Sequence, residues 1–149
     1  MNIYCNMELY TDGSCLKNPG CGGWACVTKN KFQICGGDKE TTNNIMELTA
    51  VINGLEKCLE NGEHEVTVFT DSKYVKNGIT QWIHSWISNN WMTSQNQPVK
   101  NKKLWKKLYE ISKKINSLKW EWVKAHDGNE LNEKADKLAR RTAELISQY

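Results

Sequence analysis

The chain has 149 residues, 39% of them hydrophobic and 25% charged, a balance typical of one globular domain. No stretch reaches the roughly 18 consecutive apolar residues that a membrane span needs, and residues 1–6 lack the basic and apolar segments of a secretory signal. Secreted, membrane and fibrous classes are therefore excluded, and we expect a cytoplasmic protein with no membrane partner.

Six cysteines lie at positions 5, 15, 21, 26, 35 and 58. No Cys-x-x-Cys pair occurs, and no histidine stands nearby at the spacing of a zinc site. Without an export signal, cysteines are ordinarily reduced. We therefore interpret them as small buried or half-buried hydrophobic side chains, and we expect neither structural zinc nor a disulfide framework.

Charge is unevenly distributed along the chain. The net charge is only +3, but residues 73–119 contain ten lysines and a single acid, Glu110, which gives this segment +9. The remainder holds ten basic and sixteen acidic residues, or −6. A basic segment suits a phosphate backbone, although a solvated helix face is the more usual explanation of lysines alone. Trp82, Trp86 and Trp91 lie in the same segment and favour nucleic acid.

Alternating and turn-forming residues predict three early strands, at residues 7–13, 24–28 and 32–36. The first strand is predicted to end at the Asp-Gly pair at 12–13, and the Gly-, Asn- and Pro-rich residues 14–23 to form a loop. A helix is predicted to begin near residues 41–44 and to end at the Asn-Gly pair at 61–62, because the apolar residues between follow helical spacing.

The second half of the chain alternates helices with strands. The predicted elements are a strand at 66–70, short helices at 72–79 and 81–87 separated near Gly78, a loop at 88–99, a helix at 102–115, a strand at 118–123, a loop at 125–130 and a helix at 131–146. Three strands with short connections, followed by strands that come after helices, predict an α/β fold. Its mixed sheet would be an antiparallel meander extended by right-handed crossovers, with helices packed against it.

Four carboxylates stand at positions that suit a catalytic site, and each also has an ordinary explanation. Asp12 fits an Asp-Gly turn, Asp71 a helix N-cap, and Glu47 a capping box. Asp136 fits a solvated helix acid. The helix face of Glu47 also carries Val51, so we expect this carboxylate to point toward the sheet, where it needs a partner or a metal.

Together these four residues predict one site. Asp12 and Asp71 are expected at the carboxyl ends of strands, where open α/β sheets bind ligands, and the helices that carry Glu47 and Asp136 could cover the same end. Clustered carboxylates repel one another unless a cation neutralises them, and oxygen ligands select Mg²⁺ or Mn²⁺. Two such ions about 4 Å apart stabilise the attacking and leaving oxygens of a phosphodiester displacement.

Six segments occur in the order and with the spacing of one known family, from about residue 7 to about residue 143. They are Tyr10–Gly20, Thr41–Leu48, Phe69–Val75, Gly78–Trp86, Trp120–His126 and Asn132–Arg140. Together they resemble type 1 ribonuclease H of the bacterial type. The resemblance implies a five-stranded mixed sheet flanked by helices in a single catalytic domain over residues 1–149, with an extension at 1–6 and a protruding tryptophan-rich handle at about 81–99.

The resemblance also implies a reaction, namely endonucleolytic hydrolysis of the RNA strand of an RNA–DNA hybrid, which leaves 3′-hydroxyl and 5′-phosphate ends. Asp12, Glu47, Asp71 and Asp136 match the metal-binding carboxylates of the family, with Asp12 the most central. The implied cofactor is Mg²⁺, which Mn²⁺ replaces, with two ions present when substrate is bound. His126 matches a residue that moves protons or helps to release product, and its ordinary pKa near 6.5 suits that task.

Nine further residues match substrate-binding positions of the family: Cys15, Asn18, Asn43 and Asn44 at the minor groove of the hybrid, Thr42 at a phosphate of the DNA strand, Trp82, Trp86 and Trp91 in the handle, and Asn132 beside the metal site. Polar groups at the minor groove are able to read the RNA 2′-hydroxyl, which DNA lacks. The alternative for the asparagines is turn and cap chemistry, and for the tryptophans it is packing within the handle.

One departure from the family concerns the handle. Many bacterial members carry several basic residues directly after the second handle tryptophan, whereas this chain has the uncharged residues 87–90. We therefore expect salt-dependent but weaker binding of hybrid by a monomer. Two alternatives are a junction resolvase or integrase-like DNA nuclease of the same broad fold, and a hybrid-binding module without activity. The handle tryptophans and His126 argue against the first, and the complete set of carboxylates argues against the second.

Overall fold

The structure is a computed structural model that describes residues 6–124 and 128–149, and its elements follow the predicted order with one π-helical turn added. The strands are β1 (Met7–Cys15), β2 (Gly20–Val27), β3 (Gln33–Thr41), β4 (Glu65–Thr70) and β5 (Ser117–Trp122). The helical elements are α1 (Asn43–Glu60), α2 (Lys73–Asn77), the π-helical turn η1 (Gly78–Trp82), α3 (Ile83–Ser88), α4 (Lys102–Lys113) and α5 (Glu130–Ser147).

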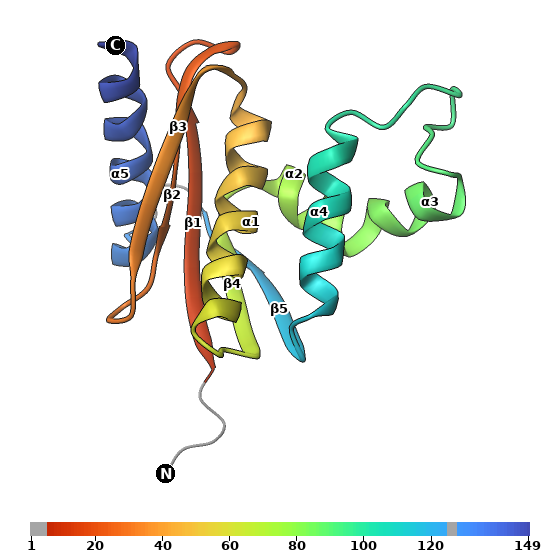
Figure 1. Ribbon diagram of the computed structural model, residues 1–149, viewed down its shortest axis with the longest axis horizontal. Coiled ribbons are helices and arrows are strands. Elements are labelled where there is room, and N and C mark those ends of the chain that lie inside the picture. Colours follow the sequence, from red (N-terminus) through yellow and green to blue (C-terminus); the bar gives the residue numbers. More distant parts are fainter. Residues whose placement is uncertain (1–5, 125–127) are drawn as a thin grey trace.

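The five strands form one mixed sheet in the order β3-β2-β1-β4-β5 (Figure 1). β1, β2 and β3 form an antiparallel meander, because only short turns connect them, whereas β4 and β5 come after helices and pair parallel to β1 and to each other. The predicted fold class is therefore confirmed.

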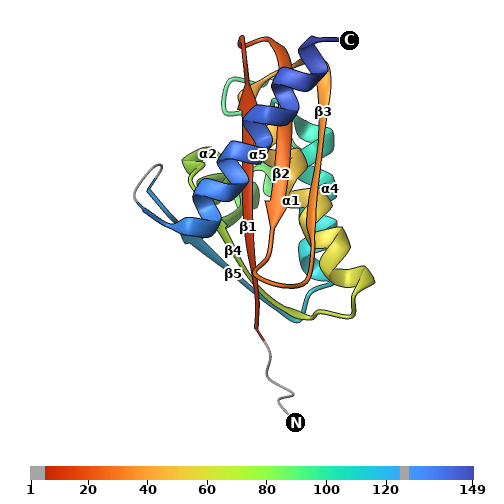
Figure 2. The same ribbon diagram turned by 90° about the vertical axis from the view of Figure 1, so that its left-hand side faces the viewer.

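Helices cover both faces of the sheet. Helices α1 and α4 pack together on one face, while α5 crosses β1, β2 and β3 on the other (Figure 2). Side chains alternate along β1, so that Leu9 joins the main core with Leu55 of α1, and Tyr10 joins a smaller cluster with Ala135 of α5. The strand that carries Asp12 is thus held on both faces.

The loop predicted for residues 14–23 is wrong in its bounds, because β1 continues to Cys15 and β2 already begins at Gly20. Gly13 is not a turn residue. It pairs with Trp24 inside the sheet, and a Cβ atom there would lie 2.5 Å from the backbone carbon of Met46 in α1. The glycine is required because α1 approaches β1 closely, not because the chain turns.

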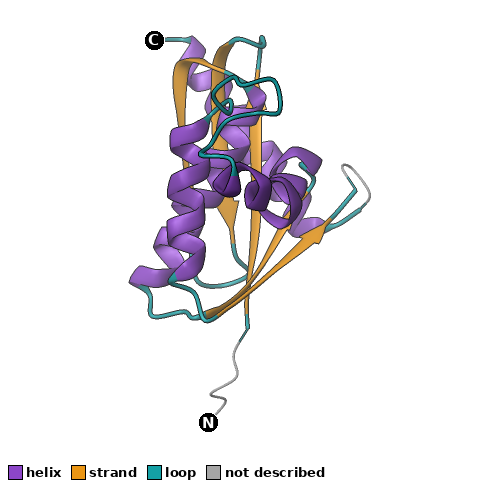
Figure 3. Cartoon of the chain, turned by 90° about the vertical axis from the view of Figure 1, so that its right-hand side faces the viewer, coloured by secondary structure: helices purple, strands orange, loops and turns teal. Residues whose placement is uncertain are grey.

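The predicted two short helices, α2 and α3, do separate at Gly78, where the π-helical turn η1 begins and joins them. Helix α2, the turn η1 and helix α3 follow one another without a break, and Gly78 is buried. A Cβ atom at Gly78 would lie 2.6 Å from a ring carbon of Trp105. The large indole of α4 therefore needs a residue without a side chain at this point. Figure 3 shows these helices from the side of the handle.

Five of the cysteines lie within the described residues, and all five are free thiols. Cys26 and Cys58 are fully buried, and burial raises the pKa of the Cys58 thiol to about 12. Cys35 is exposed, contrary to the expectation of buried or half-buried thiols, because it lies on the edge strand β3. None of the helices in the described ranges combines the length and the hydropathy needed to cross a membrane.

Candidate active site

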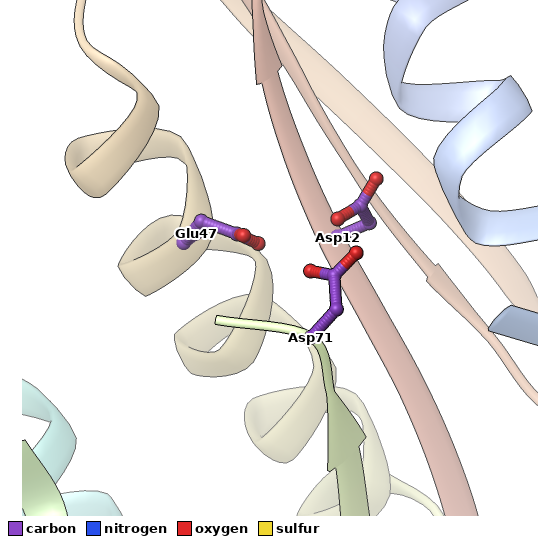
Figure 4. Close-up of side chains that lie close together, drawn as sticks. All are labelled: Asp12, Glu47 and Asp71. Atoms are coloured by element: carbon purple, nitrogen blue, oxygen red, sulfur yellow. The ribbon is translucent and has the colours of Figure 1, made fainter. Parts of the chain in front are cut away.

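Three carboxylates from separate parts of the chain converge at one end of β4. Asp12 comes from β1, Glu47 from α1, and Asp71 from the residue directly after β4 (Figure 4). One carboxylate oxygen from each lies within 4.8 Å of the others. The sequence therefore correctly predicted that these side chains meet.

The parallel register of β1 and β4 explains why Asp12 and Asp71 are neighbours. Tyr10 pairs with Phe69, and each aspartate follows two residues later. Asp71 follows the end of its strand as predicted, but Asp12 does not, because β1 continues past β4 and pairs there with β2. The site therefore lies at the end of β4 and along the middle of β1.

The ordinary explanations of the three carboxylates do not hold. Thr42 is the N-cap of α1, since its hydroxyl accepts a hydrogen bond from the N–H of Ile45, so Glu47, five residues later, has no part in a capping box. Ser72 is the N-cap of α2 and leaves Asp71 without that role. Asp12 lies inside a strand and forms no turn.

Burial and mutual repulsion dominate the electrostatics of the site. Desolvation, followed by the charges of Glu47 and Asp71, raises the pKa of Asp12 from 3.8 to about 11. Desolvation and the charge of Asp71 likewise raise the pKa of Glu47 well above its usual value, although a hydrogen bond from the backbone of Gly13 opposes this. Such a group of carboxylates is stable in its charged form only beside a cation.

The donor atoms of the site fit a hard divalent ion. Oxygen ligands alone are present in the close group, which is the set that Mg²⁺ and Mn²⁺ prefer. Within the described residues, Oε1 of Glu47 is buried and has no hydrogen-bond partner. A buried carboxylate oxygen aimed at two further carboxylates is therefore available to a metal.

Asp136 lies beside Asp12, outside the close group of three. It is half-buried on α5, and it adds to the rise in the pKa of Asp12 both through its charge and through a hydrogen bond between the two side chains. One of its oxygens lies 3.2 Å from the guanidinium of Arg140, one helical turn further on. The fourth predicted carboxylate thus borders the site and already has a cationic neighbour.

The family model of RNase H matches residues 5–144 of this chain. The chain belongs to the ribonuclease H family. A ribonuclease H of Anaplasma marginale is 51% identical over 93% of this chain and 90% of its own length. A ribonuclease H of Treponema denticola is 48% identical, with coverage of 90% and 94%. The family resemblance of the six segments is confirmed.

The fold comparison agrees with the sequence comparison. LC9-RNase H1, described as a type 1 RNase H with the type 2 active-site motif, superimposes with a TM-score of 0.84 at 28% identity, over 95% of this chain and 73% of that one. As a ribonuclease H, the chain is a metal-dependent endonuclease that hydrolyses the RNA strand of RNA–DNA hybrids.

The predicted minor-groove residues of this ribonuclease H gather near the N-terminus of α1. Asn18, in the loop after β1, accepts a hydrogen bond on its Oδ1 from the backbone N–H of Asn43 at 3.2 Å. The thiol of Cys15 lies 3.5 Å from the backbone carbonyl of Thr41. Thr42 is the N-cap, and Asn44 is exposed in the first turn. The cap and turn chemistry considered for the asparagines is thus present at Asn18.

The three handle tryptophans do not share one environment. Trp82 is 40% exposed, whereas Trp86 is half-buried and packs edge-on against the buried Trp105 at 5.2 Å between ring centroids. Trp91 lies 6.3 Å from Trp86. Packing against the core residue Trp105 of α4 therefore accounts for Trp86, while Trp82 offers an accessible ring.

Asn132 is only 1% exposed, and its Oδ1 has no hydrogen-bond partner in the described part of the chain. It lies in α5, one turn before Asp136. His126 lies outside the described residues.

Sequence reasoning missed three contacts of the site. Arg140 was not singled out, although its spacing of four residues from Asp136 on a helix is a recognisable signal. The indole N–H of Trp122 donates to the backbone carbonyl of Asp71 at 3.1 Å, and the ammonium of Lys73 lies 5.0 Å from the centre of the same indole. No local pattern in the sequence indicates that contact.

Proposed function

We propose that Asp12, Glu47, Asp71 and Asp136 form the catalytic centre of this ribonuclease H and hold two Mg²⁺ ions when a hybrid is bound, with Mn²⁺ as a substitute. The observation that supports this most is the convergence of three carboxylates within 4.8 Å, with Glu47 Oε1 buried and unpaired in the described residues. Divalent ions bound there would stabilise the attacking and leaving oxygens of the phosphodiester and lower the pKa of the attacking water.

Each carboxylate has its own task in this proposal. Asp12 is the central ligand, since it belongs to the close group and also adjoins Asp136. Glu47 and Asp71 are the other two ligands of the close group, and they come from helix α1 and from the residue after β4. Asp136, which pairs with Arg140, adds a fourth carboxylate from α5.

His126 supplies proton transfer in this proposal. An imidazole with a pKa near 6.5 gives up and takes up protons near neutral pH, which suits protonation of the leaving 3′ oxygen. Because the 3′ oxygen is the leaving group, the products have a 3′-hydroxyl and a 5′-phosphate end. This assignment rests on the sequence match of the segment Trp120–His126.

Substrate recognition is divided between two surfaces in this proposal. Cys15, Asn18, Asn43 and Asn44, with Thr42 beside them, lie at the N-terminus of α1 and face the minor groove, where 2′-hydroxyls distinguish RNA from DNA. Trp82, Trp86 and Trp91 contact the DNA strand from the handle, with Trp82 the most accessible ring. Asn132 orients the neighbouring Asp136 or the nucleic acid.

We also propose that the chain acts as a monomer in the cytoplasm, with one catalytic domain over residues 1–149, an extension at 1–6 and the handle at 81–99. These statements rest on composition and on the order of the six family segments. Size-exclusion chromatography with light scattering, on the full chain, measures the oligomeric state directly.

The decisive experiment uses an end-labelled RNA–DNA hybrid with purified protein in Mg²⁺ or EDTA. We expect the RNA strand to be cut in Mg²⁺ only and the Asp12→Asn variant to be almost inactive. Duplex DNA and duplex RNA of the same sequence serve as matched substrates, and neither should be cut. Cleavage in EDTA, or an active Asp12→Asn variant, would overturn the assignment of the site.

A further inference from the structure

The handle of this enzyme has aromatic rings but no charge. Residues 77–99, which include the whole handle, contain no Asp, Glu, Lys or Arg. A nucleic acid is bound largely through its phosphates, which need cations nearby. Before the handle the last cation is Lys76, and after it positive charge begins at Lys100 and continues into α4, which starts where the chain returns from the handle loop (Figure 1).

Three lysines share one face of α4. Lys106 follows Lys103 by three residues and Lys102 by four, and both spacings place side chains side by side on a helix surface. Lys103 and Lys106 are exposed, and Lys102 is half-buried. The opposite side of α4, which includes Leu108, is buried in the core. We refer to Lys102, Lys103 and Lys106 as the α4 lysine face.

The α4 lysine face keeps its charge, while other lysines of α4 are neutralised. Lys107 pairs with Glu56 at 3.3 Å, and Lys113 pairs with Glu110 at 3.6 Å. In the part of the chain that the structure describes, the three lysines of the face have no carboxylate within 4.0 Å. Their charge is therefore free to act on a partner.

A direct contact joins this face to the handle. The ammonium of Lys106 lies over the ring of Trp91, 5.6 Å from its centroid. Trp91 in turn neighbours Trp86, whose ring centroid lies 6.3 Å away. A nucleic acid that touched the handle tryptophans would thus have cations of α4 beside it.

Folding alone does not explain this arrangement. The first turn of α4 contains Lys102 and Lys103 and no acid, and the residue before it, Asn101, makes no side-chain cap. Cations at this end oppose the positive end of the helix dipole and lower the stability of the helix. An anion bound nearby would offset this cost.

We propose that the α4 lysine face binds the phosphate backbone of the hybrid beside the handle and supplies the charge that the handle lacks. This inference rests on the proposed function, because it assumes that hybrid reaches the handle when it is cut. The phosphate contacts then come from α4, while the handle contributes aromatic surface.

The test compares the wild-type protein with the triple variant Lys102→Gln/Lys103→Gln/Lys106→Gln in Mg²⁺-free buffer, by fluorescence anisotropy of a labelled hybrid at several salt concentrations. Three lost phosphate contacts should lower the slope of log Kd against log salt by about 2–3 and weaken binding about 10- to 100-fold at low salt. The melting temperature of the variant should equal or exceed that of wild type, because the variant has no lysines beside the positive end of the α4 helix dipole.

The matched control is Lys29→Gln/Lys31→Gln/Lys114→Gln, which removes the same charge from exposed sites outside this face. It should keep most of the wild-type slope. Equal slopes for wild type and the α4 variant, or an equal loss in the control, would overturn the proposal and leave the face as a solvated helix surface.

A second readout separates this inference from the proposed function. At saturating hybrid in Mg²⁺, the α4 variant should cut RNA with the wild-type kcat and an increased KM. If wild-type protein did not cut the hybrid at all, the proposed function would fail. If wild type cut the hybrid and the variant had an unchanged KM, only the inference about α4 would fail.

Discussion

The indole N–H of Trp122 donates a hydrogen bond to the backbone carbonyl of Asp71, at 3.1 Å. It ties the last residue of β5 to the residue that follows β4, at the point where Asp71 turns toward Asp12. This bond fixes the backbone that carries one of the three clustered carboxylates.

Replacing Trp122 should therefore loosen Asp71 without unfolding the protein. A hydrogen bond of this kind contributes about 0.5–1.5 kcal/mol, so Trp122→Phe should raise the Mg²⁺ concentration for half-maximal activity about 2- to 10-fold. Trp120→Phe, on the same strand, is the control and should change the Mg²⁺ requirement little. An unchanged requirement in Trp122→Phe would show that the bond does not position Asp71.

Asp12→Asn should stabilise the protein in the absence of metal. Below pH 3.8 this carboxyl is protonated in both the folded and the unfolded chain, so the two proteins should be equally stable. As the pH rises, the unfolded chain ionises Asp12 while the folded site, with its pKa raised to about 11, resists ionisation. The free energy of unfolding of wild type therefore falls as the pH rises, whereas that of the variant does not. Each kcal/mol of this difference corresponds to about 2–4 °C in Tm.

Thermal melts from pH 4 to pH 8 in EDTA measure this difference. The gap between Asp12→Asn and wild type should grow with pH and shrink when Mg²⁺ is added, since the ion neutralises the wild-type site. Asp38→Asn, at an exposed position, is the matched control. A variant that is less stable than wild type at pH 7 in EDTA would contradict the electrostatic account of the pocket.

Gly78→Ala should destabilise the fold through a contact that does not involve the carboxylates. The new Cβ atom would lie 2.6 Å from a ring carbon of Trp105, which is itself fully buried. Overpacking of this kind costs about 1–3 kcal/mol. Chemical denaturation of Gly78→Ala beside Gln81→Ala, an exposed control, measures the loss, and equal midpoints would refute the packing argument.

The handle tryptophans should separate binding from stability. Trp86→Ala removes the contact with Trp105 and should lower stability by about 2–4 kcal/mol. Trp82→Ala removes an exposed ring and should leave stability within about 1 kcal/mol of wild type while raising KM for the hybrid. If Trp82→Ala left KM unchanged, the accessible ring would have no part in binding.

Local patterns predicted the elements well and their junctions poorly. Helical spacing located α1 and its end at residues 61–62, and alternation located β4, because these segments are long and regular. Gly13 was misinterpreted as the end of a strand because a glycine that admits a neighbouring helix looks the same in sequence as one that forms a turn. Only the packing of α1 on β1 distinguishes the two cases.

The candidate site was predictable to the extent that it depends on motifs. Asp12, Glu47 and Asp71 belong to family segments in register, and they do converge. The bond from Trp122 to Asp71 joins residues 51 positions apart, and the contact of Lys106 with Trp91 crosses the handle loop. Such contacts depend on how the elements pack, and the sequence gives no local sign of them.

The central claim is that Asp12, Glu47 and Asp71 together bind a divalent ion. A crystal soaked in Mn²⁺ tests it most directly, because the anomalous signal locates the ion without reference to the protein. We expect a peak between these three carboxylates, and its loss in Glu47→Gln crystals treated in the same way. Manganese bound only elsewhere in wild-type crystals, with the three side chains pointing apart, would contradict the account.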